Sequence, residues 1–150
     1  MGIFTRQTIW VFLILLLGLG LRLFYLSEAI YQPDFSAPMH DAEFKDYWAH
    51  AILSGDYTPP RNEGNPFMEG YPLPNPPGYP FFLALIYWFD SGNYLAVRWV
   101  QIVLGVLNIY LVFLLTKKLF NYKAGLFAGL GIATYWAFVY YDLELNQVTI

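Results

Sequence analysis

The 150-residue chain contains no cysteine, which excludes disulfide bonds, thiolate metal sites and a cysteine nucleophile. It is also poor in charge, because Asp, Glu, Lys and Arg make up 13% of the residues, against roughly 25% in ordinary soluble domains. The net charge of −3 argues against nucleic acid as a partner. So few charges are not typical of a soluble domain.

Apolar and aromatic residues take the place of charge. Hydrophobic residues make up 57% of the chain and aromatic residues 21%, and the mean hydropathy is +0.41. Tyr, Phe and Trp in such numbers suit a surface at the boundary between lipid and water. The composition therefore indicates an all-α integral membrane protein.

Three apolar runs predict transmembrane helices over 8–26, 94–116 and 124–141. The first two have about the ~20 residues that a bilayer requires, and the third is slightly short. We expect Arg22, inside the first run, to extend its side chain to the membrane surface. A secretory signal peptide, with Arg6 in its positively charged region, is an alternative interpretation of the first run.

Residues 27–93 form a long polar loop between the first two runs. Eight of the ten prolines lie between Pro59 and Pro80, which excludes a spanning helix there and predicts a stiff, irregular segment. The apolar run 79–89 is too short to span. Its aromatic ends predict a helix that lies in the membrane interface or is re-entrant, with Pro80 in the first turn.

The distribution of charge predicts the orientation. Basic residues without acidic neighbours precede the first run and separate the second from the third: Arg6, Lys117, Lys118 and Lys123. The segment 28–90 holds nine acidic residues and only two basic ones. The positive-inside rule therefore places the N-terminus in the cytoplasm and the acidic loop on the periplasmic or exterior side.

Residues 41–54 have the period of an amphipathic helix. Phe44, Trp48, Ala51 and Ile52 fall on one stripe, which we expect to rest on the membrane with Phe44 and Trp48 facing the lipid. Lys45 is expected to be solvated. The opposite face is unusually acidic, so attraction to anionic lipid does not explain it.

Asp41 opens this helix and has two compatible interpretations. Asp is a favoured N-cap residue, and a carboxylate beside apolar surface can also act as a general base. The polar residues nearby could suggest a metal site: His40, Glu43, Asp46 and His50. Because no compact metal motif is present, a solvated polar face is the preferred interpretation.

Three segments of the chain resemble one known family. "DAEFKDYWAHAILSGDY", "NPPGYPFFLALIYWF" and "LAVRWVQIVLGVLNIYLVFLLTKKLFNYKAGLFAGLGIATYWAFVYYDLEL" are similar to the front third of bacterial membrane glycosyltransferases of family 39. These enzymes have the GT-C fold and are related to protein O-mannosyltransferases and lipid A aminoarabinose transferases. The order of the segments is more specific than any one of them.

The resemblance implies a polyprenyl-phosphate sugar donor, an acceptor that is a protein, lipid or glycan, and transfer at the outer face of the cytoplasmic membrane. It places the catalytic base at Asp41 and a cation for the donor phosphate at Arg98. The second carboxylate of the family is displaced by one residue here, to Glu43, so its role stays open. Further residues could line the site: Asp46, His50, Tyr79 and Glu144.

The sequence requires no cofactor, and it neither demands nor excludes a divalent cation. We expect the chain to be the N-terminal part of one longer membrane domain and to be inactive by itself. The alternative to an enzyme is a transporter or an envelope-assembly subunit that uses the acidic loop for docking. A transporter should place its ionisable residues near the middle of the bilayer, whereas here they gather at one interface.

Overall fold

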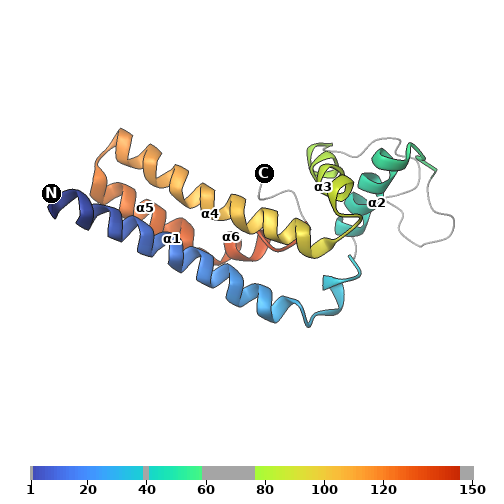
Figure 1. The fold of residues 1–150 in the computed structure, drawn as a ribbon, viewed down its shortest axis with the longest axis horizontal. Helices are drawn as coiled ribbons and strands as arrows, with labels where there is room; N and C mark the ends of the chain where they lie inside the picture. Colours follow the sequence, from blue (N-terminus) through green and yellow to red (C-terminus); the bar gives the residue numbers. More distant parts are fainter. Residues whose placement is uncertain (1, 39–40, 59–76, 146–150) are drawn as a thin grey trace. The chain divides into compact units, whose positions relative to one another are not determined.

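The computed structural model describes residues 2–38, 41–58 and 77–145, and all regular structure within them is helical (Figure 1). The helices are α1 (Gly2–Ala29), the 3₁₀ turn η1 (Pro33–Phe35), α2 (Asp41–Ser54), α3 (Gly78–Phe89), α4 (Tyr94–Leu119), α5 (Tyr122–Thr134) and α6 (Trp136–Tyr141). The all-α fold class is therefore confirmed. His40 and most of the proline-rich stretch lie outside the described residues.

The chain divides into two compact units. The first unit contains Met1–Ile30 and Val100–Leu143, and the second contains Tyr31–Trp99 with a few residues after Leu143. The helix α4 contributes its first residues to the second unit and the rest to the first.

In the first unit, α1 runs antiparallel to α4. A Cβ atom at Gly18 of α1 would overlap Ile109 of α4, and one turn further along α1, Arg22 lies against Gly105 of α4. As α1 advances, its contacts on α4 therefore move back toward the start of that helix. Glycine at each of these two positions leaves room for a side chain of the facing helix.

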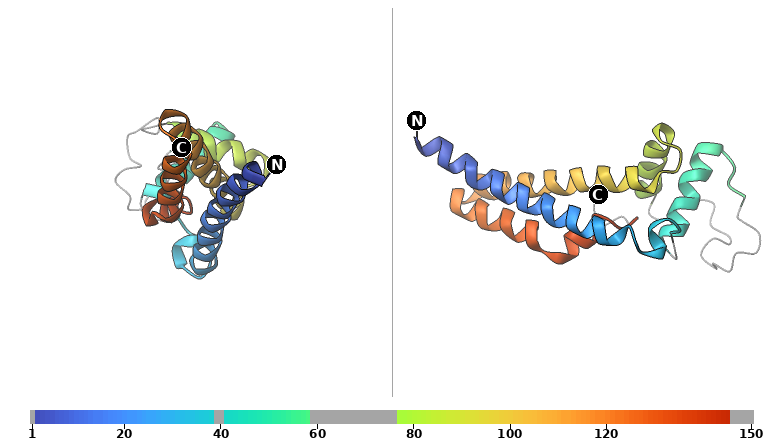
Figure 2. Two further views of the ribbon diagram at one scale, coloured as in Figure 1. Left: turned by 90° about the vertical axis from the view of Figure 1, so that its left-hand side faces the viewer. Right: turned by 60° about the horizontal axis from the view of Figure 1, so that its bottom comes forward.

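The helix α5 runs parallel to α1 in the same unit (Figure 2). Gly129 lies beside Ile14 of α1, and Ala133 lies beside Gly18, so the contacts on both helices advance together. The hydroxyl of Tyr122, at the start of α5, donates to the carbonyl of Gln7 at 2.7 Å. The N-terminal part of α1 and the α4–α5 turn therefore lie at the same end of this unit (Figure 1).

Two helices are long and apolar enough to cross a membrane, α1 over Gln7–Ala29 and α4 over Tyr94–Leu119. Only 17% of the most apolar window of α1 is buried within the protein, and 28% of that of α4. The core helix of a soluble protein would be mostly buried. The exposed apolar side chains of both helices are therefore available to lipid.

The third predicted span is not one continuous helix. Tyr135 has an extended backbone (φ −69°, ψ 113°), which ends α5 at Thr134 and lets α6 start at Trp136. The break brings the rings of Trp136 and Tyr140 against Tyr25 of α1, with ring centroids 5.2 Å and 5.8 Å apart. This packing of aromatic rings competes with continuation of α5 as one helix. The apolar run 124–141 gives no indication of the break in its sequence.

Arg22 was predicted to extend its side chain to the membrane surface, and this prediction is wrong. Its guanidinium is 1% exposed and forms an ion pair with Asp142, with Nε and Nη2 each 2.6 Å from Oδ2. Nη1 donates to the carbonyl of Gly18 at 3.1 Å. Burial of a charge is tolerated only when it is paired and hydrogen-bonded, and both conditions are met here.

The second unit is built on the packing of α2 against α3. Its core contains buried apolar side chains of α2, of α3, of the first turn of α4 and of the segment after α6: Ala49, Tyr79, Leu83, Ala84, Tyr87, Val97 and Leu145. The helix α2 has the bounds predicted for it, and Pro80 lies in the first turn of α3 as expected. The turn between α3 and α4 contains Gly92, which supplies the positive φ of 70° that this turn requires.

The apolar stripe of α2 packs inside the protein rather than against lipid. Trp48 is completely buried, and its ring lies 5.3 Å from Tyr47, 5.8 Å from Tyr57 and 6.0 Å from Phe44. The prediction that Trp48 faces the membrane is therefore wrong. An amphipathic period identifies a buried face, but it does not distinguish protein from lipid as the apolar neighbour.

Candidate functional site

Asp41 is the first residue of α2, and its carboxylate is 69% exposed. Oδ2 forms an ion pair with Nζ of Lys45, one turn along the same helix, at 2.5 Å. Asp41 and Glu43 both lie in the first turn, where the partial positive charge of the helix N-terminus stabilises carboxylates. Asp41 is therefore held in place on one side and open to solvent on the other.

Lys45 is buried, which contradicts the prediction that it is solvated. Its side chain is 5% exposed, and Nζ lies 5.9 Å from the centre of the Tyr79 ring of α3. The ammonium group therefore connects the exposed carboxylate of Asp41 to a buried ring of the neighbouring helix. Tyr79, predicted to line the site, is part of this connection rather than of an open surface.

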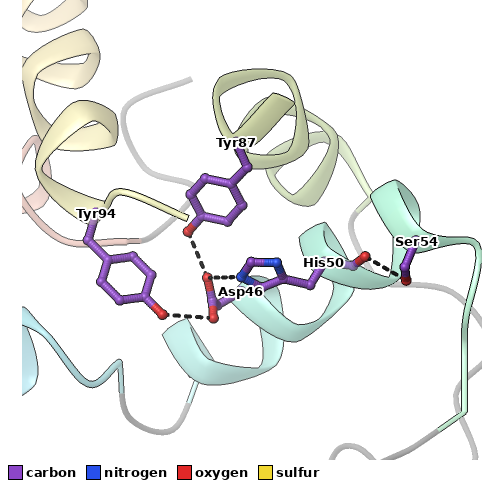
Figure 3. Close-up of polar contacts among 5 residues, drawn as sticks. All are labelled: Asp46, His50, Ser54, Tyr87 and Tyr94. Atoms are coloured by element: carbon purple, nitrogen blue, oxygen red, sulfur yellow. Dashed lines mark hydrogen bonds and ion pairs between the residues drawn. The ribbon is translucent and has the colours of Figure 1, made fainter. Parts of the chain in front are cut away.

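Asp46 lies at the centre of a polar network that joins three helices (Figure 3). The hydroxyl of Tyr87 of α3 donates to Oδ1 at 2.7 Å, and the hydroxyl of Tyr94 at the start of α4 donates to Oδ2 at 3.0 Å. The side chain of Asp46 is 16% exposed. The expectation of a solvated polar face is therefore wrong for Asp46, because each carboxylate oxygen accepts a hydrogen bond within the protein.

His50 flanks this network and is half exposed. Nε2 lies 3.8 Å from Oδ1 of Asp46, which makes an ion pair when the imidazole is protonated, and the ring stacks on Tyr87 with centroids 5.1 Å apart (Figure 3). A Cβ atom at Gly92 would touch the imidazole at 3.4 Å. The α3–α4 turn therefore packs directly on the histidine.

The Tyr87 hydroxyl is protonated at all ordinary pH values. Burial, followed by the hydrogen bond to Asp46 and its negative charge, raises the pKa of Tyr87 well above the ordinary value of 10.0. The tyrosine therefore remains a hydrogen-bond donor, which is the state that the Asp46 carboxylate needs as its partner.

Arg98 lies one turn after Tyr94 and is 4% exposed. Its guanidinium stacks on the ring of Phe35 at 3.9 Å, and Nη1 donates to the carbonyl of Tyr94 at 3.4 Å. Such stacking orients the planar guanidinium. Because the group is buried, a phosphate can reach it only if a neighbouring side chain moves.

The remaining predicted residues have less defined surroundings. Glu43 is partly buried on α2, and Glu144 is partly buried after α6, next to the buried Leu145. Within the described ranges, no three His, Asp or Glu side chains are grouped so that they could hold a metal ion. A cavity of about 200 Å³ in the first unit is lined by α1, α4 and α5 around Tyr110 and Lys117, and it contains none of the predicted site residues.

Several partners of the site residues were not predicted. The spacing of Asp41 and Lys45, four residues apart on a helix, is a signal that could have identified the pair. Tyr87 and Tyr94 lie 41 and 48 residues from Asp46, and no local pattern indicates that they meet it. Asp142 is 120 residues from Arg22, and no local pattern indicates that the two meet.

Comparison with known families gives one match. The family model described as dolichyl-phosphate-mannose-protein mannosyltransferase matches residues 74–150, just over half of the chain. The matched segment includes α3, α4, α5, α6 and Arg98, and it begins after α2 and Asp41. Comparisons with curated proteins and with solved structures found no match.

Proposed function

Because the chain belongs to the dolichyl-phosphate-mannose-protein mannosyltransferase family, we propose that it transfers a sugar from a polyprenyl-phosphate donor to an acceptor hydroxyl, with Asp41 as the general base. The family consists of glycosyltransferases that use lipid-phosphate sugars. The assignment of the base to Asp41 and of the phosphate-binding cation to Arg98 follows from the resemblance of their positions to those of the family.

The reaction is a single displacement at the anomeric carbon. The acceptor oxygen forms a bond to this carbon while the bond to the phosphate oxygen breaks, and the lipid phosphate leaves with the bonding electrons. The acceptor proton passes to the Asp41 carboxylate. Because phosphate is already a good leaving group, no second carboxyl is needed to protonate it, unlike in glycosidases. The displacement inverts the anomeric configuration.

The exposed, oriented carboxylate of Asp41 is the observation that carries the proposal. A general base must come within hydrogen-bond reach of the proton that it accepts. Oδ2 is held by the buried Lys45, whereas the side chain as a whole is 69% exposed, so an acceptor hydroxyl can approach the other oxygen. A side chain with no such restraint would lose more conformational freedom on reaching the reactive geometry.

Arg98 is our candidate for the donor phosphate. A guanidinium binds phosphate oxygens through two parallel hydrogen bonds. The face of Arg98 is fixed by Phe35, and its position at the start of α4 belongs to the matched part of the chain. Donor binding then requires movement near Phe35, because Arg98 is buried.

We place α1 and α4 across the cytoplasmic membrane, and the basic α4–α5 turn and the N-terminus in the cytoplasm. The N-terminal part of α1 and the α4–α5 turn lie at one end of the first unit, as two antiparallel spans require. The Arg22–Asp142 pair argues against a cleaved signal peptide, because cleavage would leave Asp142 without its buried partner. In the second unit, α3 has an exposed apolar face that suits the membrane interface: Phe81, Leu85, Trp88 and Phe89.

The test is Asp41→Asn in the full-length protein, assayed for sugar transfer from a polyprenyl-phosphate sugar. We expect kcat to fall by about 10²- to 10⁴-fold, the usual contribution of a general base. Asp56→Asn is the matched control, because Asp56 is an exposed carboxylate that accepts a bond from the backbone of Thr58 outside α2. Transfer by Asp41→Asn at the wild-type rate would exclude the base assignment and favour a docking role for α2.

A further inference from the structure

We infer that Asp46 is a positioning residue that sets the separation between the Asp41-bearing helix and the Arg98-bearing helix. The effect of Asp46 on catalysis rests on the proposed roles of Asp41 and Arg98. Asp46 itself need not touch the donor or the acceptor. Its effect on the distance between α2 and α4 is independent of those roles.

The connection begins on α2. Asp41 and Asp46 lie on the same short helix, about 1.4 turns apart, so a rotation or translation of α2 moves both. The carboxylate of Asp46 binds Tyr87 through Oδ1 and Tyr94 through Oδ2 (Figure 3). With both oxygens engaged by different helices, the carboxylate cannot rotate without losing a bond.

The connection continues into α4. Tyr94 is the first residue of α4, and its carbonyl accepts a hydrogen bond from Nη1 of Arg98. Tyr94 therefore contacts Asp46 through its hydroxyl and Arg98 through its backbone. The path from Asp41 along α2 to Asp46, and through Tyr94 to Arg98, contains one short helix, one side-chain bond and one helical turn.

Apolar packing alone would not fix this geometry. The core of the second unit brings Ala49 of α2 together with aliphatic and aromatic side chains of α3 and with Val97 of α4. Non-directional apolar contacts tolerate small shifts between helices, whereas hydrogen bonds are lost over a few tenths of an ångström and a few tens of degrees. A bond from the charged Asp46 carboxylate is also stronger than one between neutral groups.

The structural arm of the test measures the distance between α2 and α4 in the full-length protein. These 150 residues contain no cysteine, so, once any cysteine outside them is replaced, spin labels can be attached at Leu53→Cys on α2 and Leu95→Cys on α4, which are both exposed positions. We expect Asp46→Ala to broaden or shift the measured distance distribution. Tyr47→Phe is the matched control, because it removes a hydroxyl from the same helix, one that donates to Thr58 rather than to α3 or α4. An unchanged distribution in Asp46→Ala overturns the inference.

The catalytic arm compares kcat and the donor KM of the same variants without labels. Asp46→Ala is expected to lower kcat by about a hundredfold, the effect that a misplacement of roughly 1 Å can have, with a smaller change in the donor KM. Asp46→Asn, which keeps one acceptor oxygen, and Tyr94→Phe should fall between Asp46→Ala and the wild type. If Asp46→Ala does not fold, Asp46→Asn and Tyr94→Phe are measured in its place. A shifted distance with an unchanged kcat overturns the positioning role. A wild-type protein that transfers no sugar overturns the proposed function, while the distance measurement still decides the geometry.

Discussion

The guanidinium of Arg22 and the carboxylate of Asp142 lie 2.6 Å apart in the interior of the first unit, although 120 residues separate them in the sequence. Gly105 of α4 lies directly against the pair, where a Cβ atom would overlap the Asp142 carboxylate and come within 2.8 Å of Nε of Arg22. The pair therefore holds α1 to the segment after α6, in a space that α4 leaves open by having glycine at this position.

Removal of one partner of this pair should destabilise the protein. Asp142→Asn leaves the Arg22 charge buried without a counter-charge, and breaking a buried pair costs about 3–5 kcal/mol. We expect a lower thermal unfolding midpoint of the full-length protein in detergent. The double variant Arg22→Met with Asp142→Leu removes both charges and should recover much of the loss. A double variant less stable than Asp142→Asn would contradict this expectation. The ion pair would then stabilise the fold by more than its two charges cost to bury.

Gly105→Ala tests whether α4 must approach the ion pair so closely. The added methyl group displaces Asp142 or Arg22, and overpacking of this kind costs about 1–3 kcal/mol. The matched control is Gly20→Ala on α1, where a Cβ atom has no neighbour within 4 Å and alanine favours the helix. Gly105→Ala should lower the thermal unfolding midpoint, whereas Gly20→Ala should raise it or leave it unchanged. Equal destabilisation by both would point to a general effect of alanine.

Arg98 should act mainly on the donor. If its guanidinium binds the phosphate, Arg98→Ala should raise the donor KM by at least about tenfold, since a hydrogen bond to a charged group contributes about 1.5–3 kcal/mol. Arg98→Lys keeps the charge but loses the planar fork, so its donor KM should be intermediate. Lys118→Ala, near the other end of α4, provides the control. An unchanged donor KM in Arg98→Ala would exclude the phosphate-binding role.

Stability at alkaline pH should report on Tyr87. Its pKa is raised in the folded state, so the folded protein keeps this proton where the unfolded chain loses it. The contribution is complete below the ordinary tyrosine pKa of 10.0 and decreases as the pH rises above that value. The wild type should therefore lose about 1.4 kcal/mol more per pH unit above pH 10 than Tyr87→Phe, which cannot ionise. Parallel loss in both proteins, measured by denaturant unfolding, would contradict the buried hydrogen bond.

The membrane orientation can be tested with single cysteines, because the chain has none of its own. Ser91→Cys, in the α3–α4 turn, should react with a membrane-impermeant maleimide added to intact cells. Lys118→Cys, at the end of α4, should react only after permeabilisation. The opposite pattern would place α2 and Asp41 in the cytoplasm and contradict transfer at the outer face.

Local patterns predicted most of the helices. The period of apolar residues located α2 within its observed bounds, and α3 begins at Gly78, one residue before the predicted start. The apolar runs of α1 and α4 were found because length and composition suffice to identify them. These features depend on neighbours within a few turns, so the order of residues along the chain contains the information.

The side-chain partners depended on the tertiary structure. Whether Arg22 reaches solvent or Asp142, whether Lys45 is solvated or buried under Tyr79, and whether Asp46 faces water or two tyrosines are decided by helices that meet after folding. The break at Tyr135 belongs to the same class, because it accompanies the packing of aromatic rings against α1. The sequence by itself determined the helical membrane character of the protein and its family. Only the packed structure decided which charges are buried together, because a charge can leave water only where another segment supplies its counter-charge and hydrogen bonds.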